Sequence, residues 1–417
     1  MKLTVRKSSL NGTVQAPPSK SHTHRAYLLA ALSKGVSSVR SPLIGEDTNA
    51  TLDAVRALGA EVTADGDTVF ISGGNLHAAE EVVDCKNSGS SIRMLAGIAA
   101  GLSGKTAFTG DASLCKRPML PLLSALEELG AAVESNEGCA PFSVTGPATG
   151  NAVSIRGDIS SQFISALLLG APLSPSGRTI HLTTPLASRP YVNMTISAMK
   201  KHGVTVEETE NGFIVPAGQQ YLAADGTVSG DYSSAAFILA AGALTGTVTV
   251  TGLEEHDPQG DKAVLDLLSR FGAKVSRTGD SVTVEHGELS GIEADLSDAP
   301  DLFPIMAVVG CLAKGTTRLF GAAHLAFKES NRLETTAAFL KGMGADITAT
   351  GDGCIIQGGR PLQGTVIETR GDHRIAMAGA VAALTAEGET VIDDISCADV
   401  SYPAFVSDLR KLGGNTT

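Results

Sequence analysis

The chain has 417 residues, of which 43% are hydrophobic and 18% charged, a composition typical of a folded protein with two or three domains. A formal net charge of −12 argues against general binding to nucleic acids or acidic membranes, so an anionic ligand would need locally clustered cations. No apolar stretch reaches the about 18 residues that a membrane-spanning helix needs, and the N-terminus lacks the apolar segment of a signal peptide. Six scattered cysteines without a C-x-x-C pair predict free thiols and a cytoplasmic protein.

A helix with apolar periodicity, followed by a glycine and a short strand, recurs six times along the chain. The predicted helices cover residues 52–58, 122–129, 196–202, 264–271, 337–343 and 405–412. The glycines after them are spaced 69 to 73 residues apart, and they are Gly59, Gly130, Gly203, Gly272, Gly344 and Gly413. Spacing of this regularity indicates an internal repeat.

A second series of helices, rich in small residues, interleaves with the first. These helices are predicted over residues 26–33, 92–102, 163–173, 235–244, 302–312 and 375–384. Each runs into a glycine that suits a left-handed position, namely Gly35, Gly104, Gly177, Gly246, Gly315 and Gly388. The predicted fold is therefore α/β, with six repeats of about 70 residues that suggest two lobes of three.

Polar segments stand where the helices of the second series begin. Their Ser, Asn and Asp residues are ordinary N-caps, and capping alone explains most of them. Capping does not explain Lys20, Arg25 or the pair His373 and Arg374, because a cation at a helix N-terminus opposes the macrodipole. A cation at that position makes physical sense when an anion lies between it and the free backbone N–H groups.

The starts of the other helices carry similar residues. Arg117-Pro118 and Ser188-Arg189-Pro190 place a proline in an expected first helical turn. Lys328 and Arg332 lie four residues apart beside Glu329, on one face of an expected helix start, where a surface ion-pair ladder is the alternative interpretation.

Together these segments predict a site for ligands that carry a phosphate and more than one carboxylate. The cations are Lys20, Arg25, Arg117, Lys328, Arg332 and Arg374, and the hydroxyls come from Ser21, Ser160, Ser161, Ser188 and Tyr191. Asp301 and Glu329 stand at two of these helix starts and are acid–base candidates. The chain has no Walker A or G-x-G-x-x-G motif, and no motif calls for a metal or an organic cofactor.

Several separated motifs, taken in order, identify a family. They are Pro18-Ser19-Lys20-Ser21, Asn87-Ser88-Gly89-Ser90, Arg117-Pro118, Ser160-Ser161-Gln162-Phe163, Lys328-Glu329-Ser330-Asn331-Arg332 and Asp372-His373-Arg374. With this set the chain resembles, from about Pro17 to Pro403, the 5-enolpyruvylshikimate-3-phosphate synthases, the enolpyruvyl transferases of the shikimate pathway and of aromatic amino acid biosynthesis. The resemblance implies a two-lobed inside-out α/β barrel with the active site in the interlobe cleft. Residues 1–13 and 228–417 would form one lobe and residues 14–227 the other, each with three β/α units.

The resemblance also implies the reaction and its residues. The enolpyruvyl group of phosphoenolpyruvate would pass to the 5-hydroxyl of shikimate 3-phosphate, and phosphate would leave through a tetrahedral intermediate. Shikimate 3-phosphate would be held by Lys20, Ser21, Arg25, Ser160, Ser161, Gln162, Ser188, Tyr191, Asp301 and Lys328. Phosphoenolpyruvate would be held by Lys20, Gly89, Arg117, Gln162, Arg332 and Arg374.

Proton transfer is assigned on the same resemblance. Asp301 is the expected base at the hydroxyl and Glu329 the expected group at C3, assisted by Lys20, Lys328 and His373. The chain is expected to act as a monomer without a cofactor, and to be a glyphosate target.

Two departures from the family pattern stand near the expected phosphoenolpyruvate pocket. Val400 occupies a position where many members have lysine, and Met94 one where many have proline. Two alternatives stay open: a UDP-N-acetylglucosamine enolpyruvyl transferase, and a non-catalytic anion-binding protein of the same fold.

Overall fold

The computed structural model describes residues 1–417 and divides them into two compact units. Unit 1 comprises Met1–Pro17 and Ser229–Thr417, and unit 2 comprises Pro18–Val228. The first crossing lies after Pro17, beyond the expected residue 13. It cannot come earlier, because the second strand, Asn11–Gln15, pairs along its whole length with a strand of unit 1.

Each unit contains three four-stranded sheets of one topology, in which one parallel pair is followed by two antiparallel pairs. In unit 1 the orders are β22 (Val366–Ile367), β23 (Glu389–Ile392), β1 (Leu3–Arg6), β24 (Asn415–Thr416); β2 (Asn11–Gln15), β15 (Thr247–Thr251), β17 (Ser281–Glu285), β16 (Lys274–Thr278); and β18 (Glu293–Asp295), β19 (Gly315–Phe320), β21 (Gly353–Gly358), β20 (Asp346–Thr350). In unit 2 they are β14 (Gly226–Thr227), β3 (Gly35–Arg40), β5 (Thr68–Gly73), β4 (Glu61–Asp65); β6 (Val83–Asp84), β7 (Gly104–Thr109), β9 (Cys139–Gly146), β8 (Ala132–Asn136); and β10 (Ala152–Ile155), β11 (Arg178–Leu182), β13 (Gly212–Val215), β12 (Glu207–Thr209). Six copies of one topology confirm the repeat predicted from the glycine spacing.

The helices alternate between an inner and an outer series. The inner helices are α1 (Lys20–Leu32), α3 (Gly89–Ala99) and α5 (Ser161–Gly170) in unit 2, and α7 (Tyr232–Thr245), α9 (Phe303–Leu312) and α11 (His373–Ala383) in unit 1. The outer helices are α2 (Glu46–Ala57), α4 (Leu120–Glu128), α6 (Arg189–Lys201), α8 (Val264–Phe271), α10 (Arg332–Gly342) and α12 (Phe405–Lys411). None of these helices is long and apolar enough to cross a membrane.

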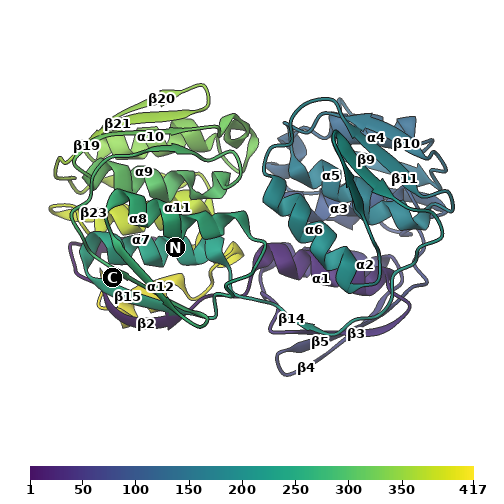
Figure 1. Ribbon diagram of the computed structural model, residues 1–417, viewed down its shortest axis with the longest axis horizontal. Helices are drawn as coiled ribbons and strands as arrows, with labels where there is room; N and C mark the ends of the chain where they lie inside the picture. Colours follow the sequence, from purple (N-terminus) through teal and green to yellow (C-terminus); the bar gives the residue numbers. More distant parts are fainter. The chain divides into compact units, whose positions relative to one another are not determined.

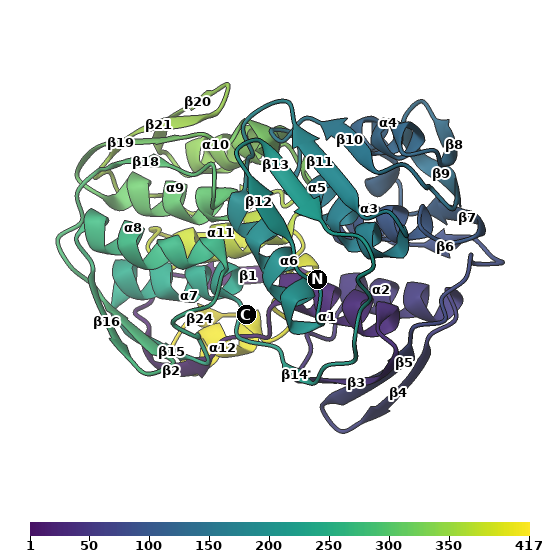
Figure 2. The ribbon, with the colours of Figure 1, turned by 45° about the vertical axis from the view of Figure 1, so that its right-hand side comes forward.

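The inner helices form the core of each unit. Every residue of α11 is buried, and α7 is buried from Tyr232 to Ala243, so these helices have no solvent-facing side over that length. A helix that is apolar all round needs neighbours on every side, which the sheets and the other helices of the unit provide (Figure 1). The strands of β3, β5 and β4 lie on the outside of unit 2 (Figure 2). Helices inside and sheets outside confirm the inside-out α/β class.

The glycines that define the repeat adopt the predicted backbone conformation, with one exception. The six that follow the outer helices have φ between 82° and 111°, a left-handed region that other residues rarely adopt. Gly246, after α7, is extended with φ of 176°, so the prediction of a left-handed conformation is wrong there. Glycine is needed at this position for space instead, because a Cβ atom would lie 2.2 Å from the carbonyl oxygen of Leu10.

Candidate functional site

In unit 1, Arg332 lies at the centre of a group that we call the carboxylate–arginine cluster, composed of Asp301, Glu329, Arg332, Asp372 and Arg374. The guanidinium of Arg332 donates from Nε to Asp372 at 2.8 Å, from Nη1 to Asp301 at 2.7 Å, and from Nη2 to Glu329 at 2.6 Å. Its Nη2 also donates to Asp372 at 3.2 Å, so four of its five N–H groups are used. Arg374 contacts the other oxygen of Asp301 at 3.0 Å.

The burial of this cluster overturns one interpretation of the sequence. Arg332 is only 1% exposed, so Lys328, Glu329 and Arg332 do not form a surface ion-pair ladder. The helix also begins later than expected: α10 starts at Arg332, because Asn331 caps it by accepting the backbone N–H of Glu334. Lys328 therefore lies outside the helix, with its Nζ atom 3.7 Å from Asp301.

Cations control the charge of Asp301. Burial by itself would raise the pKa of this carboxyl, but Arg374, Lys328 and Arg332 outweigh burial and hold the pKa well below its usual range. In Lys328 burial dominates and lowers the pKa of the ammonium, although the charge of Asp301 acts in the opposite direction. Asp301 is thus an ionised carboxylate with surrounding positive charge in the ligand-free protein.

The start of α11 contributes the remaining unit 1 groups. Asp372 caps this helix by accepting the backbone N–H of Arg374 at 3.0 Å, and the same carboxylate accepts the hydroxyl of Ser330 at 3.0 Å. Nδ1 of His373 lies 4.0 Å from Asp372. The motif Asp372-His373-Arg374 therefore combines helix capping with the placement of an imidazole and a guanidinium group.

In unit 2, Lys20 begins α1 and forms an ion pair with Asp47 of α2, with Nζ and Oδ2 2.9 Å apart. Both side chains are largely buried, and Ser19 caps the helix by accepting the backbone N–H of His22. Asp47 was missed in the sequence because an acid in a first helical turn is a common stabilising feature.

Arg25 lies in the second turn of α1, not at its start, and three of its nitrogen atoms donate hydrogen bonds within the protein. Its Nε donates to Thr195 at 2.8 Å, and its Nη atoms donate to the carbonyls of Ser21 at 2.9 Å and Tyr191 at 2.8 Å. Burial lowers the pKa of Arg25 to about 10. Arg25 thus joins the start of α1 to the start of α6.

Gln162, in the first turn of α5, connects two residues of α3. Its Oε1 accepts from Nη1 of Arg93 at 2.6 Å, and its Nε2 donates to Ser90 at 2.8 Å. The guanidinium of Arg93 also lies over the ring of Phe163, 5.3 Å from the centroid. Arg93 is a cation of this site that sequence reasoning missed, although it lies only three residues after the motif Asn87-Ser88-Gly89-Ser90.

The phosphate-binding serines expected in unit 2 occupy two helix starts. Ser160 caps α5 by accepting the backbone N–H of Gln162 at 3.3 Å, and Ser161 is the first residue of that helix. Ser188 precedes α6 with φ of 54°, a left-handed conformation that costs energy in a residue other than glycine. Pro190 lies in the first turn of α6 as predicted, whereas Pro118 precedes α4 by two residues, so that prediction is wrong.

Gly89, the first residue of α3, lies beside two guanidinium groups. A Cβ atom at this position would lie 3.2 Å from Nη1 of Arg117 and 3.6 Å from Nη1 of Arg93. Arg117 also donates to Asn87 and to Ser113, the latter at 3.3 Å. A side chain at position 89 would therefore crowd both guanidinium groups.

Replacing Gly89 by alanine should weaken the binding of a small anion at this position. The added methyl group would displace the Arg117 guanidinium by a few tenths of an ångström, and we expect KM for phosphoenolpyruvate to rise about tenfold. Steady-state kinetics with varied phosphoenolpyruvate measures this. Gly342→Ala is the matched control, because Gly342 is also a helical glycine without a positive φ and its Cβ position is open, and an unchanged KM in Gly89→Ala would contradict the assignment.

The chain is similar to known proteins along its whole length. It matches the family EPSP synthase (3-phosphoshikimate 1-carboxyvinyltransferase) over residues 5–409. It is 60% identical to the 3-phosphoshikimate 1-carboxyvinyltransferase of Methanocorpusculum labreanum, over 100% of this chain and 99% of that protein. Identity to the enzyme of that name from Methanocaldococcus jannaschii is 42%, over 99% and 98% of the two chains. Among solved structures, EPSP synthase from Acinetobacter baumannii has a TM-score of 0.84 at 28% identity, with 100% and 99% covered.

The fold and the comparisons define a transferase built as a two-unit inside-out α/β protein, and its unit 1 contains a buried cluster of acidic and basic side chains. The chain belongs to the EPSP synthase (3-phosphoshikimate 1-carboxyvinyltransferase) family. It is a shikimate-pathway transferase that moves a 1-carboxyvinyl group onto 3-phosphoshikimate, and the UDP-N-acetylglucosamine alternative is not favoured.

Proposed function

We propose that phosphoenolpyruvate is the donor, that the 5-hydroxyl of shikimate 3-phosphate is the acceptor, and that groups of both units serve this one reaction. The observation that carries the proposal is the carboxylate–arginine cluster of unit 1, in which acids and basic side chains alternate within hydrogen-bond distance. The two substrates carry two phosphates and two carboxylates, which matches the number and type of cations that the chain concentrates at its helix starts.

The family resemblance assigns the anions to the cations. In unit 2, Lys20, Arg117 and Gln162 surround phosphoenolpyruvate beside Gly89, while Ser160, Ser161 and Ser188 hold the phosphate of shikimate 3-phosphate. Ser21, Arg25 and Tyr191 complete the shikimate side. In unit 1, Arg374 contacts phosphoenolpyruvate. Arg332 uses four of its five N–H groups on Asp301, Glu329 and Asp372, so it serves chiefly to hold these carboxylates in place.

Two proton transfers accompany the bond changes. The 5-oxygen attacks C2 of phosphoenolpyruvate and loses its proton to Asp301, while C3 gains a proton through Glu329. Lys20, Lys328 and His373 stabilise the charges in the tetrahedral intermediate. In the second half C3 returns its proton, the C2–O bond to phosphate breaks, and phosphate leaves.

Substrate binding is expected to activate Asp301 as a base. A carboxylate whose pKa lies well below its usual range is a weak base, because surrounding cations stabilise its ionised form. Anionic substrates would take over part of the charge of Arg374 and Lys328, and the pKa of Asp301 would then rise towards the range that proton transfer requires. The cations thus keep Asp301 ionised, and the bound substrates would make it more basic.

Phosphate release from the purified protein tests the proposal. With phosphoenolpyruvate and shikimate 3-phosphate we expect phosphate at a rate proportional to enzyme, and none when UDP-N-acetylglucosamine replaces the shikimate substrate. Release would also show that Val400, at the end of a short 3-10 helix over Ser396–Val400, is compatible with catalysis. No release with either acceptor would favour the non-catalytic anion-binding alternative.

The location and assembly of the protein are further parts of the proposal. A cytoplasmic monomer accounts for the six cysteines, all of which are free thiols, and for a reaction whose proposed residues all come from one chain. A mass near 42.6 kDa in solution is the expected result of light scattering.

A further inference from the structure

A chain of buried hydrogen bonds connects three helices of unit 2 behind Lys20. Nδ1 of His24 on α1 lies 2.7 Å from Oγ1 of Thr51 on α2, and this hydroxyl lies 2.6 Å from Oγ of Ser91 on α3. Ser91 in turn lies 2.6 Å from Oγ of Ser88, the N-cap of α3. We call these four residues the hydroxyl network. All four are completely buried, so no water competes for their hydrogen bonds.

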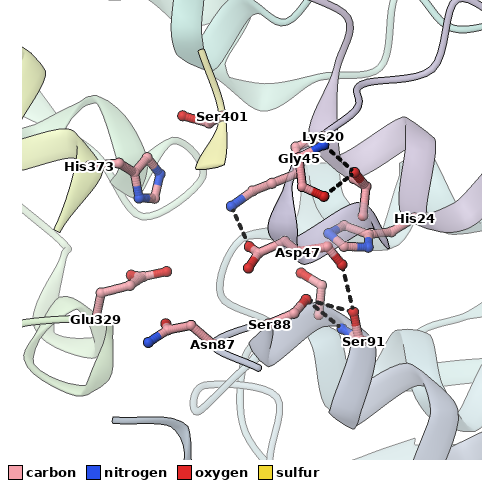
Figure 3. A network of polar contacts seen from close by, with 12 residues as sticks. Lys20, His24, Gly45, Asp47, Asn87, Ser88, Ser91, Glu329, His373 and Ser401 are labelled. Atoms are coloured by element: carbon pink, nitrogen blue, oxygen red, sulfur yellow. Dashed lines mark hydrogen bonds and ion pairs between the residues drawn. The ribbon is translucent and has the colours of Figure 1, made fainter. Parts of the chain in front are cut away.

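Helical spacing ties the hydroxyl network to the ion pair of Lys20. His24 follows Lys20 by four residues on α1, and Thr51 follows Asp47 by four residues on α2. The ion pair between Lys20 and Asp47 and the hydrogen bond between His24 and Thr51 therefore join the same faces of these two helices. Ser91 also approaches the carbonyl oxygen of Asp47 at 3.3 Å. Figure 3 shows Lys20 against Asp47, with Ser91 bonded to Asp47 and to Ser88.

The protonation state of His24 follows from its two ring nitrogens. Burial, together with the charges of Lys20 and Arg25, holds the pKa of His24 well below its ordinary value, so the ring is neutral at pH 7. Nε2 has no hydrogen-bond partner, whereas Nδ1 has Thr51. A buried N–H without a partner is rarer than a buried acceptor without one, so the proton belongs on Nδ1. His24 then donates to Thr51, Thr51 to Ser91, and Ser91 to Ser88.

We propose that His24 is a positioning residue for phosphoenolpyruvate, acting through Thr51 and Ser91 to hold Lys20 and the start of α3 in one fixed geometry. This inference rests on the proposed function, because Lys20 and Gly89 are the anion-binding groups at the two ends of the hydroxyl network. The network reaches Gly89 through Ser88, its neighbour and the cap of the helix. A shift of about 1 Å in such groups costs a large factor in rate.

A pair of substitutions at His24 separates the hydrogen bond from the packing. The amide of asparagine places its nitrogen near Nδ1 of histidine, whereas the amide of glutamine places it near Nε2. His24→Asn should keep the bond to Thr51 and leave KM for phosphoenolpyruvate within about twofold of the wild-type value, whereas His24→Gln should raise it about tenfold. KM for shikimate 3-phosphate should rise less than KM for phosphoenolpyruvate in His24→Gln, because the phosphate of that substrate is assigned to serines at the starts of α5 and α6, outside the hydroxyl network.

Thr51 gives an independent test with the same readout. Thr51→Val keeps the shape but removes the hydroxyl, and it should raise KM for phosphoenolpyruvate about tenfold, whereas Thr51→Ser should not. Wild-type phosphate release checks the proposed function separately: if it is absent, that function fails. If the wild type is active, equal KM values in His24→Asn and His24→Gln, or equal increases for both substrates, would overturn the positioning role. A change in melting temperature alone, with both KM values unchanged, would also overturn it.

Discussion

Replacing Arg332 by methionine will lower the free energy of unfolding by about 3–5 kcal/mol at pH 7 and abolish measurable turnover. The methionine fills the volume of the side chain but removes the guanidinium group that Asp301, Glu329 and Asp372 all contact. Asp372 is fully buried and cannot be compensated by water. Urea unfolding of the variant and the wild type measures the loss.

The pH dependence of this loss identifies its cause. In the wild type, Asp301 has a folded pKa below its unfolded value, so its stabilisation is present above about pH 4 and is lost as the pH falls through the folded pKa. In Arg332→Met the buried carboxyls should have raised pKa values, so acidification from pH 7 to about pH 5 should restore part of the stability.

A surface arginine is the matched control for this prediction. Arg360 pairs with Asp346 at 3.4 Å while remaining 64% exposed, and Arg360→Met should change stability by less than about 0.5 kcal/mol. If Arg332→Met were no more destabilising than Arg360→Met, the cluster would not be the charge-balanced core of unit 1 that its geometry indicates.

Asp301→Asn will reduce kcat by about two to four orders of magnitude while leaving the affinity for shikimate 3-phosphate largely intact. The amide is nearly isosteric and can still accept a hydrogen bond from Arg332, but it cannot take the proton of the attacking hydroxyl. Phosphate release under saturating substrates and a separate binding titration provide the two readouts. Full activity in this variant would exclude the base role.

Glu329→Gln should reduce kcat by a similar factor, but by slowing a different proton transfer. If Glu329 moves the proton at C3, this variant should slow the incorporation of deuterium from heavy water into the methylene group of phosphoenolpyruvate more than Asp301→Asn does. Asp266→Asn, in an exposed i,i+4 pair with Arg270, is the control for loss of one carboxylate in the same unit. Equal exchange rates in the two active-site variants would remove the distinction between their roles.

Local features of the sequence were enough to predict the α/β class and the sixfold repeat. A glycine after an outer helix is required by a left-handed backbone, and a serine or aspartate before an inner helix satisfies its free N–H groups. These requirements act within a few residues. Gly59, Ser19 and Asp372 therefore indicate the helix ends of the repeat from the local sequence alone. Family resemblance then connected the polar helix starts to a reaction.

Tertiary structure alone decided which of these residues meet and how deeply they are buried. Arg332 has the local pattern of a surface ladder, yet it contacts Asp301 and Asp372, which lie 31 and 40 residues away in the chain. His24 and Ser91 have no local signature, because an imidazole and hydroxyls on three helices acquire a common role only when those helices pack. The burial and the electrostatic environment of a side chain depend on neighbours from distant segments of the chain. For this reason the sequence determined which chemical groups are present, and the fold decided their ionisation, their partners and their positions.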